Sequence, residues 1–204
     1  MKKNKLLALM LTSLVTLHLA PSTFAAVPVP MAWYIDANGG NSHPQSPNYG
    51  AGTSTSSVTF GWNANIGYKF MPFFGAEFGY TKFGDTHIDV SALGNAQAAK
   101  DRHYAYDIAG KAMAPFGESG LEVFGKLGIS RIHSHVTVTN ANNASSVTLN
   151  TVGSHNTNGL YLAAGTDYAL TPNLTANLQW SRAKGNSTTG TLDLYSFGLS
   201  YLFC

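Results

Sequence analysis

Hydrophobic and polar residues alternate with a period of two over the last ten residues of the chain, YSFGLSYLFC. The larger residues fall at every second position: Tyr195, Phe197, Leu199, Tyr201 and Phe203. Small or polar residues separate them, chiefly Ser196, Gly198 and Ser200. This period predicts a β-strand with one apolar, aromatic face and one small, polar face. The same alternation recurs along most of the chain.

Eight segments with this alternation are predicted as strands: 32–38, 58–70, 73–83, 103–114, 121–135, 159–170, 174–184 and 191–203. Their connections alternate in length. The segments 71–72, 115–120 and 171–173 are short and contain proline, whereas 39–57, 84–102 and 136–158 are long, with 185–190 a shorter fourth. Short turns on one side and long polar loops on the other are typical of bacterial outer-membrane barrels. We therefore predict an all-β fold, an eight-stranded antiparallel transmembrane β-barrel.

The N-terminus has the composition of a secretory signal peptide. Lys2, Lys3 and Lys5 precede an apolar stretch over 6–20, and Thr23-Phe24-Ala25 offers small residues for the peptidase. We predict a signal peptide over 1–25, with cleavage after Ala26 as the alternative, and a barrel domain over 26–204. Since no other segment approaches about 18 unbroken apolar residues, a helical membrane protein is excluded. Export and the strand pattern together predict the Gram-negative outer membrane.

Composition supports a lipid-facing wall. Charged residues make up 11% of the chain and aromatic residues 12%, with 21 glycines. Without residues 1–25 the chain has nine basic and ten acidic residues, a net charge of −1, so nothing indicates a nucleic-acid partner. Cys204 is the only cysteine, which rules out an intramolecular disulfide.

The C-terminal strand also contains a recognisable signature. Ser196, Gly198, Tyr201 and Phe203 match a polar residue, a glycine two positions on, and two spaced aromatic residues. With the architecture, this pattern resembles the small eight-stranded barrels related to the transmembrane domain of outer-membrane protein A. The resemblance implies that these four residues form the signal read by the outer-membrane assembly machinery; Cys204 departs from it, since such chains commonly end at the aromatic residue. The chain ends with its last strand, so the peptidoglycan-binding activity of larger relatives is not expected.

The predicted polar faces carry charged residues among Gly, Ala, Ser and Asn: Asp36, Lys69, Glu77, Asp107, Lys111, Glu122, Lys126 and Asp167. A soluble β-sandwich or lipocalin-like barrel also alternates, but small residues suit a narrow lumen better than a solvated exterior. Charges in such a lumen are expected to pair. We predict an internal ion-pair network: Glu77, Asp107, Lys111, Glu122 and Lys126. A gate that opens by exchange of ion-pair partners is the alternative role.

Six histidines map to loops or the outer ends of strands: His43, His87, His103, His133, His135 and His155. They could bind zinc or copper or sense acid, but the sequence shows no convergence of ligands, and we predict no metal site and no cofactor. Small outer-membrane barrels include lipid A deacylases with a Ser–His pair. Here Ser134 and His133 are neighbours and point to opposite faces. Ser130 and Ser134 share the inward face, where we expect no histidine beside them, so the sequence predicts no enzyme.

These observations predict a structural and surface-display role, with adhesion as its specific form. The predicted partners are outer-membrane lipid and lipopolysaccharide, the assembly machinery, and a host or cell-surface ligand that binds the loops. Alternation over 136–139 and 147–152 suggests that the fifth and sixth strands extend as a hairpin above the membrane, where strand edges could bind a partner. The alternative function is a narrow gated pore for ions or small solutes.

Overall fold

The computed structural model describes residues 31–45, 49, 52–56, 59–91, 94, 96–144 and 152–203. Its strands are β1 Ala32–Gln45, β2 Thr53–Ser56, β3 Thr59–Met71, β4 Phe74–Lys82, β5 Thr86–Val90, β6 Ala96–Pro115, β7 Leu121–Val138, β8 Gly153–Ala169, β9 Leu174–Lys184 and β10 Thr191–Phe203. One short helix, α2 (Ala141–Ala144), follows β7. Within the described ranges, no helix is long and apolar enough to cross a membrane. The predicted signal peptide, 1–25, lies outside these ranges and stays a prediction.

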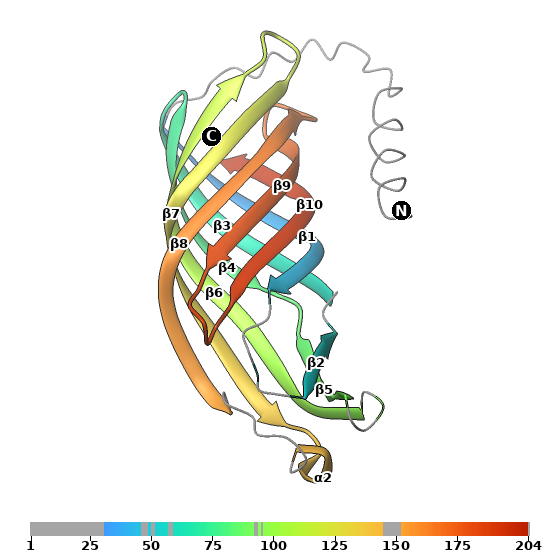
Figure 1. The fold of residues 1–204 in the computed structure, drawn as a ribbon. Coiled ribbons are helices and arrows are strands. Elements are labelled where there is room, and N and C mark those ends of the chain that lie inside the picture. Colours follow the sequence, from blue (N-terminus) through green and yellow to red (C-terminus); the bar gives the residue numbers. More distant parts are fainter. Residues whose placement is uncertain are drawn as a thin grey trace, which may run out of the picture.

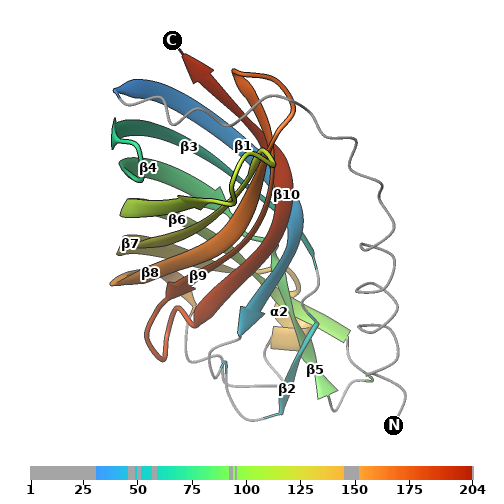
Figure 2. The ribbon, with the colours of Figure 1, turned by 90° about the horizontal axis from the view of Figure 1, so that it is seen from above.

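Eight strands close into an antiparallel ring in the order β1, β3, β4, β6, β7, β8, β9, β10 (Figures 1 and 2). The ring closes because β1 pairs with β10 along its length, from Trp33 opposite Phe203 to Gln45 opposite Thr191. The predicted eight-stranded antiparallel barrel is therefore confirmed. The two strands outside the ring, β2 and β5, extend the sheet from the outer end of β6.

The predicted strand bounds agree with the structure in the lipid-facing part of the barrel and are too short outside it. The bounds of β9 and β10 match the prediction, whereas β1, β6, β7 and β8 are longer. The connections 39–57 and 84–102, predicted as loops, contain the end of β1, the strands β2 and β5, and the start of β6. The prediction missed these strands because β2 and β5 contain only four and five residues, too few for a period of two to stand out, although Ile88 and Val90 on β5 are buried.

The two faces of the ring differ as predicted. Large apolar side chains point outward and are exposed, with 61% of Leu127 and 68% of Ile129 accessible. Their inward neighbours on β7, Lys126 and Ser130, are each 3% exposed. All three tryptophans lie on the outward face. Trp62 packs against Tyr80 with ring centroids 5.4 Å apart, and Tyr80 packs against Tyr104 at 6.0 Å. Such aromatic belts mark the membrane interfaces of a barrel.

Close contact between strand backbones requires glycine at one inward position of β7. A Cβ atom on Gly128 would lie 2.0 Å from the carbonyl oxygen of Ile108 on β6 and 2.6 Å from the Cα of Ala109. Only hydrogen fits in this space. By contrast, nothing lies within 4 Å of a Cβ atom on Gly125, which is on the outward face of the same strand.

Three strands continue well beyond the short turn between β9 and β10. β6, β7 and β8 contain 20, 18 and 17 residues, against 11 in β9 (Figure 1). A membrane-spanning strand needs about 9–11 residues, so the excess forms an extracellular extension. The extension has its own small apolar cluster of Tyr49, Ile88, Ala99 and Val136. β7 reaches Val138, as the alternation over 136–139 suggested, while 147–151 lies outside the described residues.

Candidate functional site

The lumen contains a chain of buried charges contributed by five strands. Lys126 on β7 lies 2.5 Å (Nζ to Oε2) from Glu77 on β4 and 3.9 Å from Asp36 on β1. Lys111 on β6 lies 3.7 Å from Glu77 and 3.2 Å from Asp167 on β8. All five side chains are at most 10% exposed. Two ammonium groups therefore bridge three carboxylates in the interior of the barrel.

Neutral polar and aromatic groups complete this network. The hydroxyl of Tyr34 donates a hydrogen bond of 2.6 Å to Glu77, and the side-chain amide of Asn65 donates one of 2.5 Å to Asp36. The ammonium group of Lys111 lies 4.2 Å from the ring centroid of Phe124. Buried charges are retained only where such partners compensate for lost water. Side chains thus occupy the centre of the lumen.

Only part of the predicted network is brought together. Glu77 forms ion pairs with both Lys111 and Lys126. Asp107 is 2% exposed in the same lumen, but in the described part of the chain neither its carboxylate nor that of Glu122 lies within 4.0 Å of a basic group. Asp36 and Asp167 were assigned to the inward face, yet the sequence could not show that they reach the lysines. That this ion-pair network holds together the side chains that fill the lumen stays a proposal.

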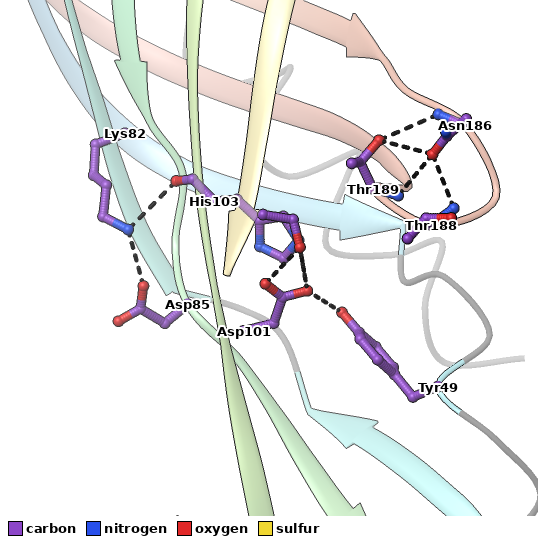
Figure 3. Close-up of polar contacts among 9 residues, drawn as sticks. Tyr49, Lys82, Asp85, Asp101, His103, Asn186, Thr188 and Thr189 are labelled. Atoms are coloured by element: carbon purple, nitrogen blue, oxygen red, sulfur yellow. Dashed lines mark hydrogen bonds and ion pairs between the residues drawn. The ribbon is translucent and has the colours of Figure 1, made fainter. Parts of the chain in front are cut away.

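A second buried polar cluster lies at the extracellular mouth, centred on Asp101 (Figure 3). Ser134 on β7 donates its hydroxyl hydrogen to Asp101 at 2.8 Å, and Tyr49, from the connection between β1 and β2, donates at 2.9 Å. The Nε2 atom of His103 lies 3.1 Å from the same carboxylate. Asp101, His103 and Ser134 are fully buried and Tyr49 is 1% exposed. The cluster joins two ring strands to the first extracellular connection.

The electrostatics of the mouth favour an ionised Asp101. Burial acts to raise the pKa of this carboxyl, but its contacts with His103, Ser134 and Tyr49 outweigh burial and hold the pKa below its usual value. A second carboxylate, Asp85, lies 3.0 Å from Lys82 and 2.9 Å from Lys100. The lysines likewise hold the pKa of Asp85 below its usual value against the effect of burial.

The turn between β9 and β10 lies across the ring from β6 and is held by side-chain hydrogen bonds (Figure 3). The side-chain oxygen of Asn186 accepts hydrogen bonds of 2.9 Å from the backbone N–H groups of Thr188 and Thr189. This arrangement is an Asx turn, for which asparagine is well suited. It keeps the connection short.

The expectation that no histidine lies beside the inward serines holds for Ser130, which is opposite Asp107 and Gly159, and is wrong for Ser134. In the observed register Ser134 is directly opposite His103 on β6 and His155 on β8. The prediction failed because the three strands had no assigned register. Even so, the hydroxyl of Ser134 bonds to Asp101 and not to a histidine. The group is also fully buried, so it is not arranged as a nucleophile with its base.

The sheet separates the outer histidines that were considered together. His103 is buried inside the barrel, whereas His133 stacks on Tyr104 on the outward face, with ring centroids 4.7 Å apart. His135 also points outward, where its Nδ1 atom is 2.7 Å from the hydroxyl of Ser154. The residues that the structure describes contain no group of three or more His, Cys, Asp or Glu side chains able to hold a metal ion.

The C-terminal signature lies on the strand that completes the ring. Ser196 and Gly198 face the lumen, whereas Tyr201 and Phe203 point outward with 46% of each side chain exposed. The two rings contact each other edge to face at 5.2 Å. Cys204 is outside the described residues. The signature therefore presents two adjacent aromatic rings at the end of β10 opposite the extension.

A sequence profile described as the OmpA-like transmembrane domain matches residues 30–204. The chain belongs to this family. Accordingly, the protein is an OmpA-like barrel of the Gram-negative outer membrane, as the sequence predicted. A comparison with curated protein sequences found no match.

Several solved structures share the fold. OprG from Pseudomonas aeruginosa is 15% identical, with a TM-score of 0.60 over 87% of this chain and 99% of its own. Neisserial surface protein A is also 15% identical, with a TM-score of 0.59 over 84% of this chain and 97% of its own. Ail, the attachment invasion locus protein of Yersinia pestis, is 13% identical in its complex with the heparin analogue sucrose octasulfate; the TM-score is 0.54, over 86% of this chain and 100% of that one. At such identities the likeness concerns the fold alone.

Proposed function

We propose that this OmpA-like barrel is a non-enzymatic display protein whose extracellular extension contacts other molecules and serves in adhesion. The observation that carries the proposal is the excess length of β6, β7 and β8, which places a large polar sheet beyond the membrane. The filled lumen supports it, because the barrel then acts as a rigid base.

The extension exposes basic groups, which suits an acidic ligand. Arg102 on β6 and Arg131 on β7 are exposed, and in the described residues neither forms an ion pair with a carboxylate. Ail, a structural neighbour, was solved with a heparin analogue. Immobilised heparin and epithelial cell layers are therefore suitable surfaces for an adhesion assay.

The test is to shorten the extension without opening the ring. Residues 132–157 are replaced by Asn-Gly, which joins the paired residues Arg131 and Asn158 through a two-residue hairpin turn and removes the outer part of β7 and β8. Bacteria that express this variant should bind no better than cells without the protein. The control is Gly125→Ala on the lipid-facing side of β7, where an added methyl group meets no atom within 4 Å, and binding should be unchanged. Equal binding by the shortened and intact proteins, at equal amounts in the outer membrane, would contradict the proposal.

The alternative function is a narrow gated pore. Single-channel recording of the detergent-folded protein distinguishes it from display. Discrete conductance that disappears on replacing Glu77 or Lys111, and that survives shortening of the extension, would favour the pore. A barrel that shows no discrete conductance, but does show the usual difference in gel mobility between boiled and unboiled samples, would favour display.

Two further partners follow from the outer face and the last strand. We propose that the aromatic and apolar exterior contacts lipid and lipopolysaccharide. We also propose that Ser196, Gly198, Tyr201 and Phe203 form the signal for the assembly machinery. The exposed pair of rings at Tyr201 and Phe203 supports this role, since a binding partner could reach both together.

A further inference from the structure

The outer half of β8 has an open backbone edge. β8 pairs with β7 from Gly153 onward, but its pairing with β9 begins only at Tyr161. The two strands separate at Gly159, where a Cβ atom would lie 1.7 Å from the carbonyl oxygen of Lys184 at the end of β9. In the part of the chain that the structure describes, no strand pairs with the remaining side of Gly153–Asn158. Figure 1 shows β8 continuing past the turn between β9 and β10.

This edge lacks the usual protection against pairing. Natural edge strands are blocked by proline, by lysine, by a bulge or by very short length. The segment Gly-Ser-His-Asn-Thr-Asn contains neither proline nor lysine, and its register with β7 is continuous. None of its six residues is buried, although the inward residues Ile132 and Ser134 on the adjacent β7 are fully buried. Its free N–H and C=O groups are therefore open to an added strand.

The exposed charged side chains beside this edge, Arg131 and Lys184, are positive. From Ile132 through Thr166 the sequence contains no Asp, Glu, Lys or Arg. Exposed Arg131 lies opposite Asn158 on the outward face, and exposed Lys184 ends β9 where the two strands separate. The acidic groups at this level on the neighbouring strands, Asp101 and Asp193, are buried and already bound by partners.

We propose that an extended acidic peptide segment of a partner protein binds here, as a strand added antiparallel or parallel to Gly153–Asn158. This inference deepens the proposed display function and rests on it. Backbone hydrogen bonds to β8 supply the affinity, and carboxylates on the added strand meet Arg131 and Lys184. A second copy of this chain fits less well, because pairing two identical edges would bring like charges together. A sulfated or phosphorylated glycan could use the charges but not the backbone groups.

Three synthetic peptides test the two requirements separately. The probe is a fluorescein-labelled decapeptide, TETETTETET. One control replaces its central Thr-Thr by Pro-Pro, which keeps the charge and removes two consecutive N–H donors. The other replaces every glutamate by lysine. Fluorescence anisotropy with the full-length barrel folded in detergent micelles should show binding of the probe and at least roughly tenfold weaker binding of both controls.

Equal binding of the Thr-Thr and Pro-Pro peptides would overturn strand addition and would show that the peptides bind through charge alone. Complete displacement of both peptides by heparin at an equal concentration would lead to the same conclusion. Failure of the probe to bind at millimolar concentration would overturn the proposal altogether.

Proline substitutions along β8 give a second, independent readout. In an antiparallel pair, successive residues direct their N–H groups alternately to the two neighbouring strands. Proline at each position from Ser154 to Asn158 should therefore abolish probe binding at every second position while the heat-dependent gel mobility is kept. At the other positions proline should weaken pairing with β7. Loss of binding without this alternation would contradict an added strand. Arg131→Gln should weaken binding severalfold without affecting the fold.

The inference and the display function can fail separately. If the shortened barrel adheres to cells as well as the intact one, display by the extension is wrong whatever the peptides do. If adhesion depends on the extension but the peptides do not discriminate, display stands and strand addition is wrong.

Discussion

Ser134 on β7 donates a hydrogen bond of 2.8 Å to Asp101 on β6, although the residue directly opposite it in the ladder is His103. The Asp101 carboxylate is therefore the acceptor that the hydrogen-bond donors at the extracellular end of the barrel share. Tyr49, from a different connection, donates to its other oxygen atom. Because all of these groups are buried, the Asp101 carboxylate links the outer ends of β6 and β7 to Tyr49 in the connection between β1 and β2.

Asp101→Asn should destabilise the extracellular mouth. An amide offers one acceptor oxygen in place of two and no charge, so the bonds from Ser134 and Tyr49 weaken together. Hydrogen bonds to a buried charged group contribute about 1.5–3 kcal/mol. We expect the urea midpoint of the detergent-folded barrel to fall accordingly. Asp89→Asn on β5 is the matched control, since Asp89 is partly exposed and lies outside this cluster; a similar fall in both variants would contradict a specific role for Asp101.

Acid should weaken the mouth in a defined pH range. Burial tends to raise the pKa of Asp101 and of Asp85, but hydrogen bonds and basic neighbours lower both below the ordinary value of 3.8. A carboxyl whose pKa is lowered on folding contributes stability that is complete above its unfolded value and is lost as pH falls through the folded one. The urea midpoint should therefore be steady down to about pH 4 and decline below it. In the double variant Asp85→Asn/Asp101→Asn this decline should be smaller; an unchanged decline would assign it to other carboxyls.

Gly128→Ala should impair folding, because its methyl group would overlap the backbone of β6 at Ile108. The strands would have to separate locally, at a cost of roughly 1–3 kcal/mol. Gly125→Ala, three residues earlier on β7, should be tolerated since its methyl group points into open space on the lipid side. The fraction of protein that keeps the unboiled gel mobility measures both. Equal folding of the two variants would show that the strand contact at Gly128 is not tight.

Lys126→Met should be strongly destabilising, and a second substitution should compensate for part of the loss. Removing the ammonium group leaves Glu77 and Asp36 with fewer cationic partners in a buried site, and breaking such a pair costs about 3–5 kcal/mol. In Lys126→Met/Glu77→Gln the uncompensated carboxylate is gone, so the urea midpoint should partly recover. Arg102→Gln on the exposed extension should change stability by no more than about 0.5 kcal/mol. Additive losses in the double variant would mean that the two lumen residues act independently.

The lipid-facing wall was the part of the fold that the sequence could predict. A strand between lipid and a narrow lumen must alternate, so β9 and β10 were bounded correctly and Glu77, Lys111 and Lys126 were placed inward. Contacts across the lumen could not be predicted, because they depend on the register between neighbouring strands. Lys126 lies opposite Lys111 and Ala163 in the ladder, yet its ammonium group reaches Glu77 on β4, two strands away. The mouth could not be predicted at all, because Asp101 and Ser134 meet through a register offset and Tyr49 comes from a connection without periodicity.

The C-terminal signature gives the last prediction. If Tyr201 and Phe203 are read together on the outward face, Phe203→Ala should reduce the amount of assembled barrel in the outer membrane, because one of two adjacent rings is lost. Leu202→Ala is the matched control, since residue 202 lies between them on the opposite face of β10. The measurement is the heat-modifiable fraction in isolated outer membranes, compared with refolding of the same purified variants in detergent. A defect in cells with normal refolding in detergent assigns Phe203 to assembly; equal defects in both would make it a packing residue of the closing strand.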